Sequence, residues 1–595
     1  MVATPTPPTK LTGVLPLPFK DESIAINYRL SLFLNSHKKL RVDMVSKLEF
    51  RQAAELAIQN IVKHGDTDIF PFPFENYAFF DKCPEIVELV VEYDEHFEEY
   101  LARFSPLNVS SLTPVTYSGF RWATQIDPIW NAHFLACVLA LSKKMEAARA
   151  KKSDDIVFSY RNQANFPAGD LFDRNYGWVQ FMEHSVKLST EFEFVVACDI
   201  SEFYPRLGHH RIENELKQIA GDTPYPKRIM QFLSNYSNTR SFGLPIGGPA
   251  ARILSEITIN QIDRLLIGNG IRFARFADDY HLFAESREDA YRYLIFLSEK
   301  LIDNQGLSLQ KAKTRIMTSS EFRATNPLRR QMEDDAADDD FQPTDHGSRE
   351  LLRFSLWFDP YSTTAKADYE RLRSEIKKFD IIKLLKDELA KSRIHTALAK
   401  KVVSAIRYLE DQPQEESGRS PKDEAVLSIL ENCDVLYPIF SSVLLMIDQV
   451  FEELSDAAKA EVIAEIQKLI KNRSHVFRVD VHLSFAIRVL AHSNSPDNQA
   501  LLQQIYEERT SPIVRRDIIL VLAKWGEWYW LSDVRNRFRE LSGPERRAFI
   551  VASYILKDEG DHWRRHIGKE LNPFERFIMS WAGQKANNPN WAIPL

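Results

Sequence analysis

The chain has few cysteines and no long apolar run, and both shortages exclude protein classes. Its four cysteines are too far apart for a disulfide framework or a paired zinc motif; they are Cys83, Cys137, Cys198 and Cys433. No apolar segment approaches the length of a membrane span. The segment from Met1 to Phe19 is rich in Pro and Thr and lacks the apolar core of a signal peptide. We therefore expect a flexible N-terminal arm and a cytoplasmic protein in a reducing compartment, without a membrane partner.

Positive charge is also in short supply, because the 595 residues carry a net charge of -7. Proteins that grip long nucleic acids usually present a basic face, since neutralising phosphates supplies most of the non-specific affinity. Much of the acidic excess lies in the run Glu333–Asp340, which we interpret as part of a solvated linker. The charge balance favours a protein that handles a short or tethered product over one that binds long duplexes.

What the chain does have is the adjacent carboxylate pair in Phe276-Ala277-Asp278-Asp279, flanked by two apolar runs. Taken alone, this pair is also typical of a solvated hairpin turn. A further carboxylate, Asp199, ends the apolar, β-rich run that begins at Glu193. One Asp at the end of a strand and two at a neighbouring hairpin can converge on a pair of divalent cations.

Such a convergence has a chemical purpose. Hard oxygen ligands suit Mg²⁺, which also takes substrate phosphate oxygens. In a two-metal site one ion activates the attacking hydroxyl and the other stabilises the leaving pyrophosphate. Three carboxylates without a cation would repel one another in a partly buried cleft. The sequence therefore predicts that Asp199, Asp278 and Asp279 form a nucleotidyl-transfer site.

Two more segments lie around the carboxylates. Gly243 to Pro249 precedes an apolar helical pattern, and its glycines would let the backbone approach a base pair or template closely, although an ordinary strand-to-helix turn fits as well. Gly306 to Arg315 is a short strand-like run that ends in bases. In it Lys313 is a candidate general acid for pyrophosphate, or a solvated lysine.

The order of these segments resembles the palm of reverse transcriptases. Motif A corresponds to Asp199, motif B to Gly243–Gly247, motif C to Phe276–Asp279 and motif D to Gly306–Thr314. The resemblance covers residues 110 to 325 and implies an α+β fold of palm and fingers. The reaction that it implies is polymerisation of deoxynucleoside triphosphates.

The resemblance also implies roles for single residues in the metal and sugar sites. Asp199 and Asp278 would be the principal ligands of two Mg²⁺ ions, or Mn²⁺ in their place, with Asp279 beside them and the Ile200 carbonyl completing the shell. Tyr204 falls where reverse transcriptases carry the aromatic steric gate, which would clash with a 2'-hydroxyl. A packed core aromatic is the alternative for Tyr204.

Nucleotide contacts are implied at five other positions. Pro245 and Gly247 belong to motif B, and Lys313 to motif D. Arg161 and Arg121 are candidates for the fingers arginine that meets the triphosphate, because a guanidinium suits that contact. Each of the two arginines could equally be structural.

Motif B departs from the usual pattern. This chain reads Leu244-Pro245-Ile246-Gly247 where most reverse transcriptases read Leu-Pro-Gln-Gly, so the supporting amide is missing. The later Ser-Pro pair is replaced by Ala251-Arg252. The altered motif is similar to that of the bacterial abortive-infection reverse transcriptases of the AbiK type, on the residues Gly243, Pro245, Gly247, Arg252, Ile253 and Glu256.

This second resemblance implies a function in defence against phage. It implies protein-primed DNA synthesis without a template, a DNA product covalently attached to the protein, a homo-oligomer, and helical repeats in place of a conventional thumb. Two alternatives stay open. One is an RNA-templated reverse transcriptase of the retron or group II intron type, and the other is a non-catalytic scaffold or phage sensor on a palm fold.

The last 246 residues change to long amphipathic helical patterns. Ser511 to Ala523 reads like the second half of a HEAT-type unit, although no sharp repeat period is visible. We expect a stack of helical hairpins. A break at Gln412–Asp423 should separate two of its helices. The expected helices include Phe440–Leu454, Ala457–Ile470, Phe485–Leu490, Pro512–Trp525 and Pro544–Leu556.

Together these features predict four parts of the chain. They are an N-terminal arm with a helical or fingers extension (1–110), reverse transcriptase-like fingers and palm (111–330), an acidic linker (331–349) and an all-α, HEAT-like repeat domain (350–595).

Overall fold

The computed structural model of the chain describes residues 49–163, 169–237, 240–325, 351, 365–410, 419–588 and 591–595. The predicted N-terminal arm at Met1–Phe19 and the acidic linker at 331–349 lie outside these residues. The chain separates into two units, Met1–Gln52 and Ala53–Leu595, and the elements described below belong to the second. The predicted domain boundaries at 110, 330 and 349 stay predictions.

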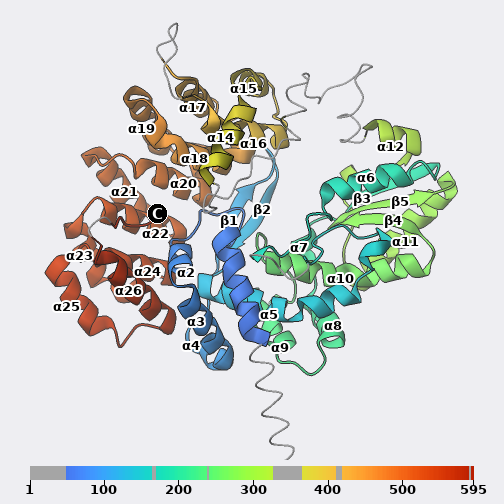
Figure 1. The fold of residues 1–595 in the computed structure, drawn as a ribbon, viewed down its shortest axis with the longest axis horizontal. Coiled ribbons are helices and arrows are strands. Elements are labelled where there is room, and N and C mark those ends of the chain that lie inside the picture. The colour runs from blue at the N-terminus through green and yellow to red at the C-terminus, as the bar shows by residue number, and fades with distance from the viewer. Residues whose placement is uncertain are drawn as a thin grey trace, which may run out of the picture. The chain divides into compact units, whose positions relative to one another are not determined.

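A four-stranded antiparallel sheet carries the predicted carboxylates (Figure 1). Its strand order is β4-β5-β3-β6. The register sets Asp199 opposite Asp279 on the two central strands. The strands are β3 (Phe194–Asp199), β4 (Arg272–Phe276), β5 (Asp279–Ala284) and β6 (Arg315–Thr318).

Helices cover both faces of this sheet. Successive side chains of each strand point to opposite faces, so each face has its own set of packing residues. On one face Val195, Ala274 and Phe283 pack with Phe181 of α6 (Trp178–Leu188) and Phe322 of α12 (Ser319–Thr325). The other face contacts α10 (Pro249–Gly268) and α11 (Arg287–Gln305). Helix α11 begins at the Ser286 cap and ends at Gly306, which has the positive φ of 68° that such an end requires. The result is a rigid platform whose central strands end at the carboxylates.

The segments between β3 and β4 form α7 (Phe203–Arg206), α8 (His209–Ala220), α9 (Tyr225–Tyr236) and then α10. Helix α10 is buried on nearly all sides and starts with Pro249, whose fixed φ suits the first helical position. This places the motif B loop immediately before a helix that is buried along most of its length.

The N-terminal part of this unit is a group of helices and a hairpin. They are α2 (Glu75–Asp81), α3 (Cys83–Glu95), α4 (Phe97–Arg103), β1 (Val109–Pro114), β2 (Phe120–Gln125) and α5 (Pro128–Ala148). In the β1–β2 hairpin, Ser111 and Thr113 on one face are buried, whereas Leu112, Phe120 and Trp122 on the other are exposed. The buried face is the one that a contact with α20 can cover.

The C-terminal part is helical, as predicted. Helices α18, α20, α22, α24 and α26 pack successively on one another, and helices between them contact this inner row (Figure 1). Most residues of α20 and α22 are fully buried. The helices are α14 (Ala365–Ile376), α15 (Ile381–Leu389), α16 (Thr396–Ala405), α17 (Pro421–Glu431), α18 (Phe440–Val450), α19 (Asp456–Lys471), α20 (Asp480–Leu490), α21 (Pro496–Glu508), α22 (Pro512–Lys524), α23 (Trp528–Asn536), α24 (Gly543–Ala552), α25 (Lys557–Ile567) and α26 (Pro573–Ala586).

Side-chain caps explain where several of these helices begin. Ser420, Ser542 and Asn572 each form a capping box with the acidic residue three positions later. The predicted break extends to Asp423, whereas the Ser420 cap already starts α17 at Pro421. Residues 412–418 of that break lie outside the described part of the chain. No described helix combines the length and the apolarity needed to cross a membrane. The HEAT-type nature of the repeats stays a prediction.

Candidate active site

The structure brings the three predicted carboxylates together at one end of the central strands. Asp199 ends β3, Asp279 begins β5, and Asp278 lies in the β4–β5 turn. The strand register pairs Asp199 directly with Asp279. The N–H of Ile200 donates to the Asp278 carbonyl at 3.1 Å, so the backbone after motif A runs beside the motif C turn.

The electrostatics of this group suit a cation site. Burial first, and then the neighbouring carboxylates, raise the pKa of Asp279 to about 7. Burial is also the main cause that raises the pKa of Asp278 to about 6, with Asp199 adding to it. Crowded carboxylates resist ionisation unless positive charge is added. Because all the donors are hard oxygens, the set fits Mg²⁺.

Motif D contributes one positive charge to this group. The Nζ of Lys313 lies 2.6 Å from Oδ2 of Asp199, although most of the lysine side chain is exposed. The backbone supports this placement, since Gln310 N–H donates to the Asp199 carbonyl at 2.7 Å and Ser201 N–H to the Ser308 carbonyl at 2.8 Å. The predicted motif D lysine is therefore held beside motif A.

A buried ion network, which the sequence analysis did not identify, supports the motif C turn. Arg275 is fully buried and bonds Asp263 at 2.7 Å and Glu256 at 2.9 Å, both on α10. Its Nη1 also donates to the Ala277 carbonyl at 2.9 Å, and Ala277 has a strained φ of 53°. Arg149 adds a second contact to Glu256, at 2.6 Å. The sequence did contain a signal for this network. Arg275 lies inside the apolar run 271–277, and a charged side chain that is buried there requires a buried partner.

Motif B is tightly fitted to the protein itself. Gly247 has a φ of 124°, and a Cβ at this position would lie 2.4 Å from Oγ1 of Thr67. The carbonyl of Ile246 accepts a long bond of 3.5 Å from the Thr124 N–H. Pro245 is buried in the loop. The sequence left open whether the glycines of this loop admit a base pair or template or form an ordinary strand-to-helix turn. The neighbour that requires glycine at 247 in this structure is Thr67, and a nucleotide contact of Gly247 stays a prediction.

All four motifs lie within the part of the chain that matches a known family. Residues 131–338 match the model of the family described as reverse transcriptase (RNA-dependent DNA polymerase). The chain contains a reverse transcriptase domain. The matched domain is accordingly of the RNA-directed DNA polymerase family of nucleotidyltransferases. A search of curated proteins finds no match.

Solved structures similar to this chain include two telomerases. One is the telomerase of Candida albicans in complex with a TWJ fragment of telomeric RNA, with 12% identity over 64% of this chain and 66% of that chain, and a TM-score of 0.27. The apo telomerase of Candida tropicalis has 11% identity over 67% of this chain and 74% of that chain, also with a TM-score of 0.27. This chain thus spans just under two thirds of the first telomerase, and alignments so loose define neither substrate nor partner.

In the reverse transcriptase domain, Tyr204 lies at the start of α7, next to motif B. Its carbonyl accepts from the Leu244 N–H at 3.0 Å. Burial first, and then Tyr160, raise the pKa of Tyr204, so the phenol stays neutral and faces a second phenol. Arg252 lies 5.6 Å from the centre of the Tyr160 ring. Tyr160 has a positive φ of 46°, which the sequence did not reveal.

The two predicted fingers arginines are placed differently. Arg161 is 1% exposed, its Nε lies 3.2 Å from Glu146, and its Nη2 donates to the Ala150 carbonyl at 2.6 Å. Its guanidinium thus serves contacts within the protein. Arg121 is half-buried on β2, opposite Thr113. A role for either arginine at the triphosphate stays a prediction.

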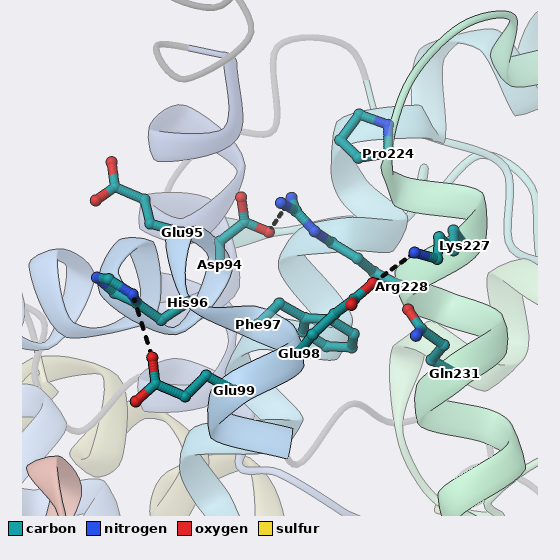
Figure 2. Close-up of a pocket in the computed structure, with 10 residues that line it drawn as sticks. All are labelled: Asp94, Glu95, His96, Phe97, Glu98, Glu99, Pro224, Lys227, Arg228 and Gln231. Carbon is teal, nitrogen blue, oxygen red and sulfur yellow. Dashed lines mark hydrogen bonds and ion pairs between the residues drawn. The ribbon is translucent and has the colours of Figure 1, made fainter. Parts of the chain in front are cut away.

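A second group of potential metal ligands lies away from the aspartates. Among the described residues, the one set of three whose ligand atoms all lie within 4.8 Å of one another is Asp94, His133 and Cys137. Arg228 forms an ion pair with Asp94, and burial lowers the pKa of His133. Figure 2 shows the adjoining pocket, about 400 Å³ in volume, in which Lys227 pairs with Glu98. Because Arg228 already neutralises Asp94, we interpret this set as part of the core.

Proposed function

We propose that this reverse transcriptase-family polymerase makes DNA in bacterial defence against phage, by protein-primed, template-independent addition of deoxynucleotides. The observation that carries the proposal is the convergence of Asp199, Asp278 and Asp279, with the pKa of the last two raised. This arrangement suits two-metal nucleotidyl transfer. It is compatible with a protein primer and with a nucleic-acid primer.

The chain's own residues have separate tasks in this reaction. Asp199, Asp278 and Asp279, with the Ile200 carbonyl, would hold two Mg²⁺ ions. When bound, such ions activate the attacking hydroxyl and stabilise the leaving pyrophosphate. Lys313, which reaches Asp199, would donate a proton to that pyrophosphate.

Tyr204 would select the sugar. Its ring is half-buried beside motif B and is backed by Tyr160. A fixed ring leaves no room for a 2'-hydroxyl, so deoxynucleotides would be preferred.

Two features support synthesis without a template. The side chain of Ile246 has no hydrogen-bonding group, so it cannot replace the amide that usually stands at this position. The net charge of -7 suits a product that is held covalently better than one held by phosphate contacts. The defence role rests on the resemblance to the abortive-infection enzymes.

The proposed homo-oligomer has a suitable surface on α11. Tyr291, Ile295 and Ile302 are 54%, 62% and 57% exposed, and with Ser298 they follow the spacing four, three, four of a helix-pairing seam. In an antiparallel pairing with a second copy, Tyr291 would face Ile302 and Ile295 would face Ser298. Arg292 and Glu299 flank the seam on the same side and would meet as opposite charges across it.

The test of the function is incorporation without template. Purified protein receives Mg²⁺ and each labelled deoxynucleotide, and the products are run on denaturing gels with and without protease, with Asp278→Ala as control. Label that stays with the protein until protease treatment, and that the variant loses, would support the proposal. Incorporation only after RNA is added would favour the RNA-templated alternative, which the family match to RNA-dependent DNA polymerases keeps open. No incorporation under either condition would favour the scaffold.

A further inference from the structure

The segment Asp66–Phe72 lies directly behind the motif B loop. Its Thr67 hydroxyl occupies the space that a side chain at Gly247 would need. A Cβ on Gly248 would lie 3.6 Å from the Asp66 carbonyl. Asp68 at the edge of the segment pairs with Arg252, just after motif B, at 3.0 Å. Any shift of this segment must therefore move the motif B loop or open a gap behind it.

The other side of the same segment is held by the helical repeats. Arg488 of α20 donates from Nη2 to the Phe72 carbonyl at 2.7 Å. Gln125 donates to Oδ2 of Asp66 at 3.0 Å and to the Pro71 carbonyl at 3.3 Å. Nη1 of Arg516, on α22, reaches Oε1 of Gln125 at 3.5 Å. Both ends of the segment are thus connected to arginines of the repeats, one directly and one through Gln125.

A single carboxylate orients both arginines. Asp517 is fully buried, and it accepts from Nε of Arg516 at 2.7 Å and from Nε of Arg488 at 3.1 Å. Although burial opposes ionisation, the charges of Arg488 and Arg516 lower the pKa of Asp517, so it stays an anion. Buried pairs of this kind give strong directional restraint, because neither partner can turn to water.

We propose that α20 and α22 set the position of the motif B loop through this relay, with Arg488 and Arg516 as positioning residues. The proposal rests on the proposed function in that motif B contacts the incoming nucleotide. Ile246 has no side-chain amide that could hold the substrate against the motif B loop. The position of the loop therefore depends on the segment Asp66–Phe72, which lies behind it. The helical repeats would then influence how the incoming nucleotide is positioned, in addition to forming a surface of the protein.

The test compares Arg516→Met with Arg547→Met in the full chain. Arg547 of α24 is also buried and pairs with Glu75 at 2.6 Å and Asp127 at 2.9 Å, so it joins the repeats to the N-terminal helices through partners outside the segment Asp66–Phe72. Hydrogen exchange of the peptide containing 243–250 is measured without nucleotide, and KM and kcat are measured with it. We expect Arg516→Met to speed hydrogen exchange in that peptide. It should also lower kcat/KM on the order of 10-fold to 100-fold, because a small displacement of groups that position the substrate slows the reaction by about this factor. Arg547→Met should lower the melting temperature and leave the exchange of that peptide unchanged.

Unchanged motif B exchange in Arg516→Met, or equal acceleration in both variants, would overturn the relay. If Arg516→Met does not fold, Gln125→Leu cuts the same path from the other side, and the same exchange result decides. Exchange does not depend on catalysis, so a wild-type protein without polymerase activity would overturn the proposed function and leave the relay to be judged by exchange alone.

Discussion

The Nζ of Lys313 lies 2.6 Å from Oδ2 of Asp199, which joins motif D to motif A by an ion pair. Most of the lysine side chain is exposed, so its ammonium group can leave Asp199 and bind another anion. A leaving pyrophosphate released next to Asp199 would be such an anion.

Replacement of this lysine should slow the chemical step. Lys313→Met removes the proton donor, so we expect kcat to fall on the order of 10²-fold to 10⁴-fold, with a smaller change in KM. The measurement is single-turnover incorporation of one labelled deoxynucleotide. Lys311→Met, an exposed lysine on the same short turn, is the matched control. Equal rates for both variants would remove Lys313 from the chemistry.

Loss of Asp278 should abolish both ion binding and incorporation. Asp278→Asn keeps the size of the side chain and removes its charge, so we expect incorporation to fall on the order of 10³-fold or more, as the loss of several kcal/mol of charge stabilisation implies. Mn²⁺ binding, followed by electron paramagnetic resonance, gives a readout that is independent of substrate. Glu285→Gln changes an exposed acid just past β5 and should leave both readouts intact. Wild-type binding of Mn²⁺ by Asp278→Asn would contradict the assignment.

The ring of Tyr204, and not its hydroxyl, should determine the choice of sugar. Tyr204→Ala opens the space below the ribose, so we expect ribonucleotide incorporation to rise at least about 10-fold relative to deoxynucleotides. Tyr204→Phe keeps the ring and should keep the preference. The check is the ratio of kcat/KM for the two sugars. A preference unchanged in Tyr204→Ala would show that Tyr204 is only a packed aromatic.

Charge exchange on α11 should test the seam. Arg292→Glu or Glu299→Arg alone places like charges across the pairing, so each should weaken self-association. The double variant restores opposite charges and should recover it. Each exposed pair contributes only about 0.2–1 kcal/mol, so Ile295→Asp should have the larger effect. Sedimentation velocity over a range of protein concentrations measures the change, and a double variant no better than the singles would contradict this pairing.

The repeats should lose stability in acid through His482. Its Nδ1 lies 2.9 Å from the Val476 carbonyl, and burial lowers its pKa to about 4. The unfolded chain, with a pKa of about 6.5, binds the proton first as the pH falls, so stability is complete above pH 6.5 and declines towards pH 4. Between pH 7 and 5 this group should account for about 2 kcal/mol. His482→Asn keeps a donor and does not titrate, so urea unfolding should show a shallower pH dependence; an identical slope would contradict the prediction.

Much of the palm and of the helical part could be predicted because their patterns are local. The apolar run that ends at Asp199 and the pair at Asp278 became β3 and the β4–β5 turn. The pattern at Pro512–Trp525 became α22 (Pro512–Lys524), and Ala457–Ile470 became α19 (Asp456–Lys471). Caps and prolines mark such ends in the sequence itself.

The supports of the site could not be predicted, because they depend on partners far away in the chain. Arg275 and Asp263 are charged residues in apolar segments, and only the fold shows that they neutralise each other. Arg161 had the chemistry for a triphosphate, yet in the structure its guanidinium lies against Glu146. A residue type fixes what a side chain can bind, whereas its neighbours decide what it does bind.

The close contact of Gly247 with Thr67 also limits how motif B can change during evolution. Alanine at 247 would combine a left-handed backbone with a collision at 2.4 Å, so no single substitution there is tolerated. A smaller residue at 67 would remove the collision but leave the backbone strain, so glycine is required at 247 for two separate reasons. Position 247 should therefore stay glycine among descendants of this protein, even in those that have changed residue 67, which lies 180 residues earlier in the chain.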